Sequence, residues 1–182
     1  MTAVFINSFI LFFVTIDTIG NIPFFLSLTE DAKIKQRNQI AIRSVVIAFF
    51  IMITFAYAGR YLLEVIDVSL DSLKIAGGII LMFLAIDILF EKRKKRREKR
   101  VEDALDEKSF EEIIVFPIAI PFIAGPSALT TVILLIGNYS TNTEFQIPVI
   151  LALVAALVVS LILMIGANFI VKFIPKQILH AT

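Results

Sequence analysis

The chain has 182 residues, of which 58% are hydrophobic and 18% are charged, and its formal net charge at pH 7 is +1. A soluble domain of this length has more charge, so the composition indicates an integral membrane protein. Cysteine is absent and His180 is the one histidine, which excludes disulfides and metal sites built on Cys or His clusters. We expect no cofactor, and no cleaved signal peptide because the first residues carry no basic leader.

The hydrophobic runs predict an all-α protein with about five spans. A helix needs roughly 20 apolar residues to cross the bilayer core. The runs cover about residues 3–28, 40–65, 72–90, 113–137 and 145–174. We expect a first repeat of three spans (1–91), a charged cytoplasmic loop (92–111) and a second repeat with two spans (112–182).

The first run is interrupted in the stretch "FFVTIDTIGNIPFFLSLT" (residues 12–29), which contains Asp17, Gly20, Asn21 and Pro23. A carboxylate at this depth is costly unless it is paired or hydrated, so such residues usually have a function. We interpret Asp17 as a candidate proton carrier, or as a ligand for Na⁺ or a substrate ammonium. A structural role stays open, in which Asp17 caps the helix after the break or hydrogen-bonds a neighbouring hydroxyl.

The second and third runs carry charges near their ends. Arg60 and Glu64 are one helical turn apart and can pair. Asp87 lies about one turn before the basic loop, where it can reach the interface or pair with Lys92. The glycines of "KIAGGIIL" favour close helix packing.

The basic residues predict the orientation. All of the 17 Lys and Arg residues except Arg60 and Lys74 fall in segments that five spans place on one side. Basic loops are cytoplasmic, so we expect the N-terminus outside and the loop inside, in the cytoplasmic membrane. Acidic residues follow the run "EKRKKRREKR" closely, which favours a membrane-side anchor and argues against a nucleic-acid partner.

The fourth run, "FPIAIPFIAGPSALTTVILL" (116–135), is broken in the corresponding place by Pro121, Gly125 and Pro126. Repeats with an odd number of spans are inverted relative to each other. Transporters built from inverted repeats bind their solutes near the midplane of the membrane, at discontinuous helices. We expect a substrate site where the two breaks face each other, although Pro and Gly are also common in ordinary membrane helices. The expected polar lining consists of Thr15, Thr18, Asn21, Ser27, Ser127, Thr130 and Thr131.

The expected lining contains no nucleophile–base pair. There is no Ser-His-Asp set and no phosphate-binding loop, and neither aspartate in the runs lies in the Gly-rich motif of an intramembrane protease. We therefore expect recognition of a solute and no enzymatic activity.

The segments "DTIGNIPFFLSLT", "KIAGGIILMFLAIDIL" and "EEIIVFPIAIPFIAGPSALTTVILL" resemble the MarC family of bacterial and archaeal membrane proteins over nearly the whole chain. The family patterns, close to D-P-I-G-N-I-P and A-I-P-x-x-A-G-P-G-A, map onto both breaks. Thr18 and Ser127 stand where the family usually has Pro and Gly, so we expect a milder first break and no left-handed backbone at Ser127.

The resemblance implies an inner-membrane protein similar to the lysine-exporter superfamily, in which transport or export of a small solute is usual. The family plan usually has six spans, and the chain stops after the fifth, so the second inverted repeat lacks its last span. We expect a truncated product, a fragment or a five-span variant completed by homo-oligomerisation. The alternative function is a non-transporting assembly or regulatory protein that uses the basic segment 91–100 as its contact.

Overall fold

We describe a computed structural model of the chain. It describes residues 1–30, 32–69, 71–73, 75–76, 78–80, 82–83, 86, 111–140 and 142–173, without the side chains of residues 60 and 168–173. The regular structure in these ranges is helical, which confirms the all-α prediction. The elements are α1 (Thr2–Thr15), α2 (Asn21–Leu28), α3 (Ile34–Val65), the distorted helix η1 (Ile114–Ile123), α6 (Pro126–Asn138) and α7 (Thr143–Phe173).

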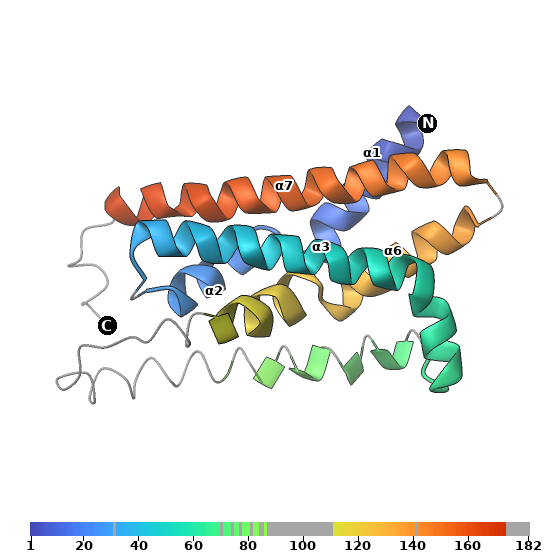
Figure 1. Cartoon of the computed structure of the whole chain (residues 1–182), viewed down its shortest axis with the longest axis horizontal. Coiled ribbons are helices and arrows are strands. Elements are labelled where there is room, and N and C mark those ends of the chain that lie inside the picture. The colour runs from blue at the N-terminus through green and yellow to red at the C-terminus, as the bar shows by residue number, and fades with distance from the viewer. Residues whose placement is uncertain are drawn as a thin grey trace.

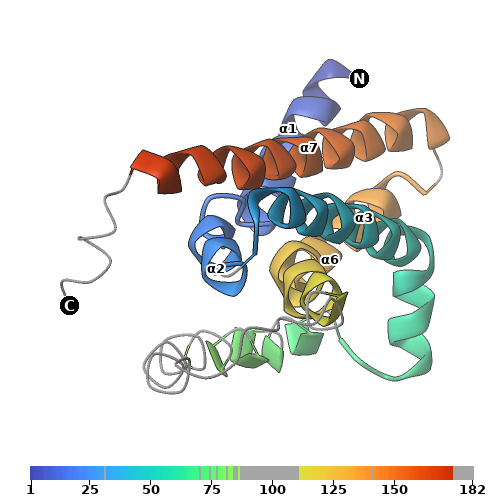
Figure 2. The ribbon, with the colours of Figure 1, turned by 60° about the vertical axis from the view of Figure 1, so that its left-hand side comes forward.

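The long helices α3 and α7 lie lengthwise beside each other, with α1, α2, η1 and α6 packed around them (Figures 1 and 2). Two described helical stretches are long and apolar enough to cross a membrane, Ile34–Gly59 and Thr143–Ala167. A third candidate is the pair Glu111–Ile123 and Pro126–Asn138, bent by 60° at its break. The described part therefore supports two or three spans. The count of five and the inverted repeat stay predictions, because most of run 72–90 lies outside the described residues.

Helix α3 begins at Ile34, earlier than the predicted residue 40, because its first turns are polar and an apolar run does not include them. The side chain of Gln36 accepts the Lys33 N–H at 3.0 Å and caps this start. Arg37 donates from Nη2 and Nε to the Thr29 carbonyl at 2.7 and 3.1 Å. Arg37 therefore ties the end of α2 to the start of α3.

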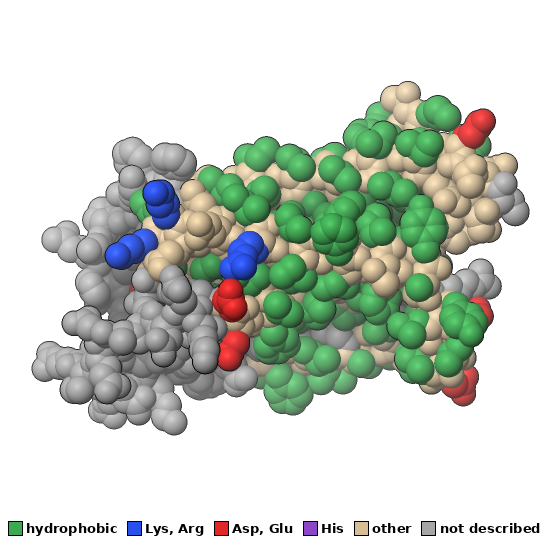
Figure 3. Space-filling view, viewed as in Figure 1, with side chains coloured by type: hydrophobic (Ala, Val, Ile, Leu, Met, Phe, Trp, Pro, Cys, Tyr) green, Lys and Arg blue, Asp and Glu red, His purple; other side chains and the backbone are tan. Residues whose placement is uncertain are grey.

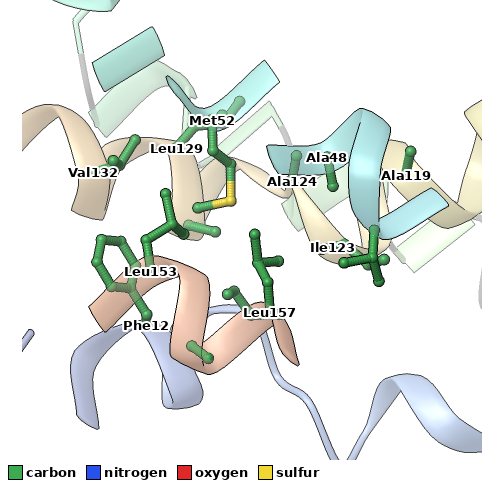
Figure 4. Packing of buried hydrophobic residues seen from close by; sticks show 14 of the residues in the cluster. Phe12, Ala48, Met52, Ala119, Ile123, Ala124, Leu129, Val132, Leu153 and Leu157 are labelled. Carbon is green, nitrogen blue, oxygen red and sulfur yellow. The ribbon is translucent and has the colours of Figure 1, made fainter. Parts of the chain in front are cut away.

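The core lies where α1, α3, α6 and α7 meet. Figure 4 shows Met52 of α3 beside Leu129 of α6 and Leu153 of α7, with Phe12 of α1 next to them. Gly59 lets α3 approach α6 closely, since a Cβ there would lie 2.7 Å from a side-chain carbon of α6. Close packing of this kind is the main attraction between helices in a bilayer, where lipid is as apolar as the core.

The surface has an apolar middle and charged ends. Figure 3 shows hydrophobic side chains over the middle of the long helices and basic side chains near one end. Lys33, Lys35 and Arg43 all belong to the start of α3, whereas Asp67 and Glu144 lie at the ends of α3 and α7 that face the other way. This distribution fits a helical protein whose middle contacts lipid.

Candidate functional site

The first break lies between Thr15, where α1 ends, and Asn21, where α2 begins. Asp17 has a φ of 50°, the left-handed region that Asp tolerates better than most residues. Its Oδ1 accepts the Gly20 N–H at 3.2 Å. A Cβ at Gly20 would lie 2.7 Å from that oxygen, so a larger residue there would displace the Asp17 carboxylate. The Asp17 carboxylate therefore hydrogen-bonds the backbone just before α2, although α2 has no side-chain cap of its own. The Asp17 side chain is exposed on the described part of the fold.

The second break combines two prolines with an extended glycine. Phe116 and Ile120 leave helical geometry, with φ and ψ near −128° and +125°, and each precedes a proline that disfavours helix at that position. Both X-Pro bonds are cis. Gly125 is extended (φ −76°, ψ 166°), and a Cβ there would lie 2.5 Å from the Pro121 carbonyl oxygen. Helix α6 then starts at Pro126, where a missing N–H costs nothing.

Asn21 joins the two breaks. Its Nδ2 donates to the carbonyl of Ile16 at 2.6 Å, in the first break, and to the carbonyl of Phe122 at 2.9 Å, in the second. The side chain is 6% exposed. Beside it, the rings of Phe24 and Phe122 lie 5.2 Å apart. The two breaks are therefore in direct contact, and one amide group satisfies a backbone carbonyl in each of them, as an apolar environment requires.

Three hydroxyl groups, those of Thr18, Ser160 and Ser44, hold the breaks against the long helices. Thr18 Oγ1 and Ser160 Oγ of α7 lie 2.9 Å apart, and Ser160 donates to the Ala156 carbonyl at 3.0 Å. Because Ser160 has one proton, Thr18 is then the donor of the shared bond. Ser44 of α3 donates to the carbonyl of Ile114 at 3.0 Å, at the start of η1. Sequence patterns alone do not single out Ser44 or Ser160, because their contacts with Ile114 and Thr18 depend on the tertiary packing.

The remaining predicted site residues differ in exposure. Pro23 is exposed in the first turn of α2, and Ser127 is exposed and helical in α6, which confirms that it is not left-handed. Thr130 is 2% exposed, and its Oγ1 has no hydrogen-bond partner among the described residues. Four other described threonines in or directly after helices donate to the carbonyl four residues earlier: Thr15, Thr29, Thr54 and Thr131. Buried hydroxyl groups are normally hydrogen-bonded, so Thr130 differs from these four threonines in lacking a hydrogen-bond partner among the described residues.

These groups suit hydrogen bonding to a polar molecule. The described residues contain no group of three or more His, Asp or Glu side chains that could hold a metal ion. Asp87 lies outside the described residues.

An all-helical chain with apolar spans and two helix breaks in contact is a membrane protein by fold. The family model for MarC family integral membrane proteins matches residues 2–181, and the chain belongs to that family. A "UPF0056 membrane protein" of Archaeoglobus fulgidus is 38% identical over 159 residues, which cover 87% of this chain and 72% of that protein.

Two other relatives also match most of the chain. A "UPF0056 membrane protein" of Methanocaldococcus jannaschii is 33% identical over 168 residues, covering 92% of this chain and 73% of its own length. The "UPF0056 inner membrane protein YhgN" of Escherichia coli is 29% identical over 166 residues, covering 91% and 75%. No solved structure matches the chain.

Proposed function

We propose that the protein moves a small polar solute across the cytoplasmic membrane and binds it where the two helix breaks meet. The observation that carries the proposal is the contact made by Asn21, which joins backbone carbonyls 101 residues apart in sequence. Breaks in membrane helices persist where protein or a wet cavity satisfies the backbone. The buried hydroxyl of Thr130, one turn into the helix that follows the second break, adds a polar group that a solute can bind.

In this mechanism a solute competes with the Asn21 amide for the Phe122 carbonyl. A solute with its own hydrogen-bond donors takes over the Phe122 carbonyl, and the contact between the breaks opens. The first repeat then rocks against the second, as in other carriers whose sites lie between repeats. The contact of Thr18 with Ser160 keeps the first break attached to α7 during this movement.

We also propose that transport is coupled to protons and that Asp17 carries the proton. This coupling is supported by the position of the carboxylate, which accepts the Gly20 N–H in the first break, directly before Asn21.

The orientation with the N-terminus outside also belongs to the proposal. It is supported by Lys33, Lys35, Arg37 and Arg43, which all lie at the start of α3, at the end of the fold opposite to the N-terminus in Figure 1. Basic residues at the ends of spans face the cytoplasm.

The test is a screen for ligands that stabilise the detergent-purified protein, at two pH values, with amino acids, sugars, nucleosides and organic cations. A ligand that binds the native state raises the Tm as its concentration exceeds Kd. We expect the shift to be lost in Thr130→Val and retained in Thr131→Val, because Thr131 already donates to its own helix. Asp17→Asn should remove the pH dependence of the shift.

A shift that persists unchanged in Thr130→Val would place the solute away from the breaks. A folded protein that no member of the panel stabilises would contradict solute binding and favour the non-transporting alternative, whose proposed contact segment lies outside the described residues.

A further inference from the structure

One face of α3 is exposed over most of the helix. Its exposed residues recur every three or four positions, which is the spacing of a single helix face: Lys35, Gln39, Ile42, Val46 and Phe50. The first two side chains are polar, and the next three are large and apolar. This face therefore offers a polar part followed by an apolar part, as a lipid headgroup and its chains require.

The length of this exposed face matches the thickness of a bilayer. Tyr57 is exposed and continues the face two turns after Phe50. At a rise of about 1.5 Å per residue, Lys35 and Tyr57 are about 33 Å apart along α3. The hydrocarbon core of a bilayer is about 30 Å thick, and tyrosine is enriched at its boundaries. Lys35 therefore lies at the level of the lipid headgroups when Tyr57 lies at the opposite interface.

The basic residues at this end of α3 differ in whether a carboxylate neutralises them. Lys33 and Lys35 are exposed, and neither forms an ion pair with another described residue. Arg43, two turns after Lys35, is paired, because its Nη1 lies 3.4 Å from Oε1 of Glu111. Figure 3 shows basic side chains on the surface at this end of the fold. The charges of Lys33 and Lys35 are therefore accessible to an anion at the membrane surface.

We propose that the start of α3 binds an anionic phospholipid. The phosphate lies at Lys35 and Gln39, an acyl chain lies along Ile42 and Val46, and Lys33 adds positive charge at the same end. Lysine binds phosphate as a point charge, and a glutamine amide can donate to a phosphate oxygen. Basic residues beside a membrane helix attract anionic lipid headgroups. The proposal does not depend on the transport function, since none of these residues belongs to either helix break.

The sequence suggests a rival arrangement, because Glu30 and Asp31 precede these lysines in the chain. If the two carboxylates neutralised the lysines, removing the charge of Lys35 would leave lipid binding unchanged. Free phosphate is a second candidate for the polar part of the face. The exposed apolar residues favour the lipid, since a free anion gains nothing from Ile42 and Val46.

The test measures lipid binding to the detergent-purified full chain by native mass spectrometry. Dioleoyl phosphatidylglycerol is the probe, and dioleoyl phosphatidylcholine, with the same chains and no net charge, is the reference. We expect the first phosphatidylglycerol to bind more tightly than the reference lipid. Lys35→Gln should weaken this binding about fivefold, the share of one basic side chain at an anionic surface, whereas Lys35→Arg should retain it. Glycerol 3-phosphate, which has no chains, should not compete.

Two controls separate a local site from an effect of net charge. Replacing Arg43 and Glu111 together by glutamine removes an ion pair without changing the net charge, and should leave the affinity unchanged. Asp67→Asn, just beyond the other end of α3, compensates the charge lost in Lys35→Gln, and the fivefold loss should persist in that combination. The proposal is overturned if phosphatidylcholine binds as tightly, if Lys35→Gln binds normally, if Asp67→Asn restores binding, or if glycerol 3-phosphate competes as well as the lipid.

Discussion

The two hydrogen bonds of Asn21 allow us to predict how much stability the protein loses when this side chain is replaced. Replacement by leucine keeps most of the side-chain volume and removes the donor shared by the Ile16 and Phe122 carbonyls. A buried carbonyl left without a partner costs about 1–3 kcal/mol in soluble proteins. Side-chain hydrogen bonds in membrane proteins average about 0.6 kcal/mol. For two lost bonds we expect Asn21→Leu to lower the free energy of unfolding by about 2 kcal/mol.

The assay is reversible unfolding in mixed micelles, followed by far-ultraviolet circular dichroism because the chain contains no tryptophan. Thr54→Val is the matched control, since Thr54 is exposed and its hydroxyl donates within α3, to the Phe50 carbonyl. We expect the control to change stability by less than about 0.5 kcal/mol. If Asn21→Leu were as mild as the control, the contact between the breaks would contribute nothing to stability, and the reasoning would be refuted.

Three further predictions concern the same region. Gly20→Ala should lower the Tm because its Cβ meets the Asp17 carboxylate, and the loss should be smaller in a background of Asp17→Ala, where the obstruction is absent; additive effects would contradict the contact. Thr18→Val and Ser160→Ala should show a coupling of about 1 kcal/mol in a double-mutant cycle of unfolding, whereas a coupling near zero would mean that no shared bond exists. Gly125→Ala should destabilise more than Gly20→Ala in the same melts, because a backbone carbonyl that cannot rotate away obstructs it; an equal or smaller loss would argue against this geometry.

The sequence predicted the breaks well because their causes are local. Proline removes a donor and restricts the residue before it, so Pro121 and Pro126 identify the second break without tertiary information. The apolar runs likewise located α3 and α7, although the polar first turns of α3 lay outside the run. The resemblance of the motifs to the MarC family was confirmed by the match over residues 2–181.

The partners of the polar groups could not be predicted in the same way. The donor atoms of Asn21 and Ser44 reach carbonyls 101 and 70 residues away, and such acceptors depend on how the helices pack. The sequence left two roles open for Asp17, and the bond to Gly20 locates its carboxylate just before α2 without testing either role.

The central claim is that the two breaks contact each other in the membrane, and the absence of cysteine from the chain allows a direct test. Cysteines are placed at Phe24 and Phe122, whose rings lie 5.2 Å apart, and the protein is treated in native membranes with a short bifunctional thiol reagent. Cleavage of the denatured protein at its internal methionines then separates the fragments that carry the two positions.

The account predicts that these two fragments remain joined in the double variant and separate in each single variant. A cysteine pair at Thr18 and Ser160, whose hydroxyl oxygens lie 2.9 Å apart, serves as the positive control, because the same cleavage separates those positions. Joined fragments in the control together with separate fragments for Phe24 and Phe122 would contradict the meeting of the breaks and the solute site built on it.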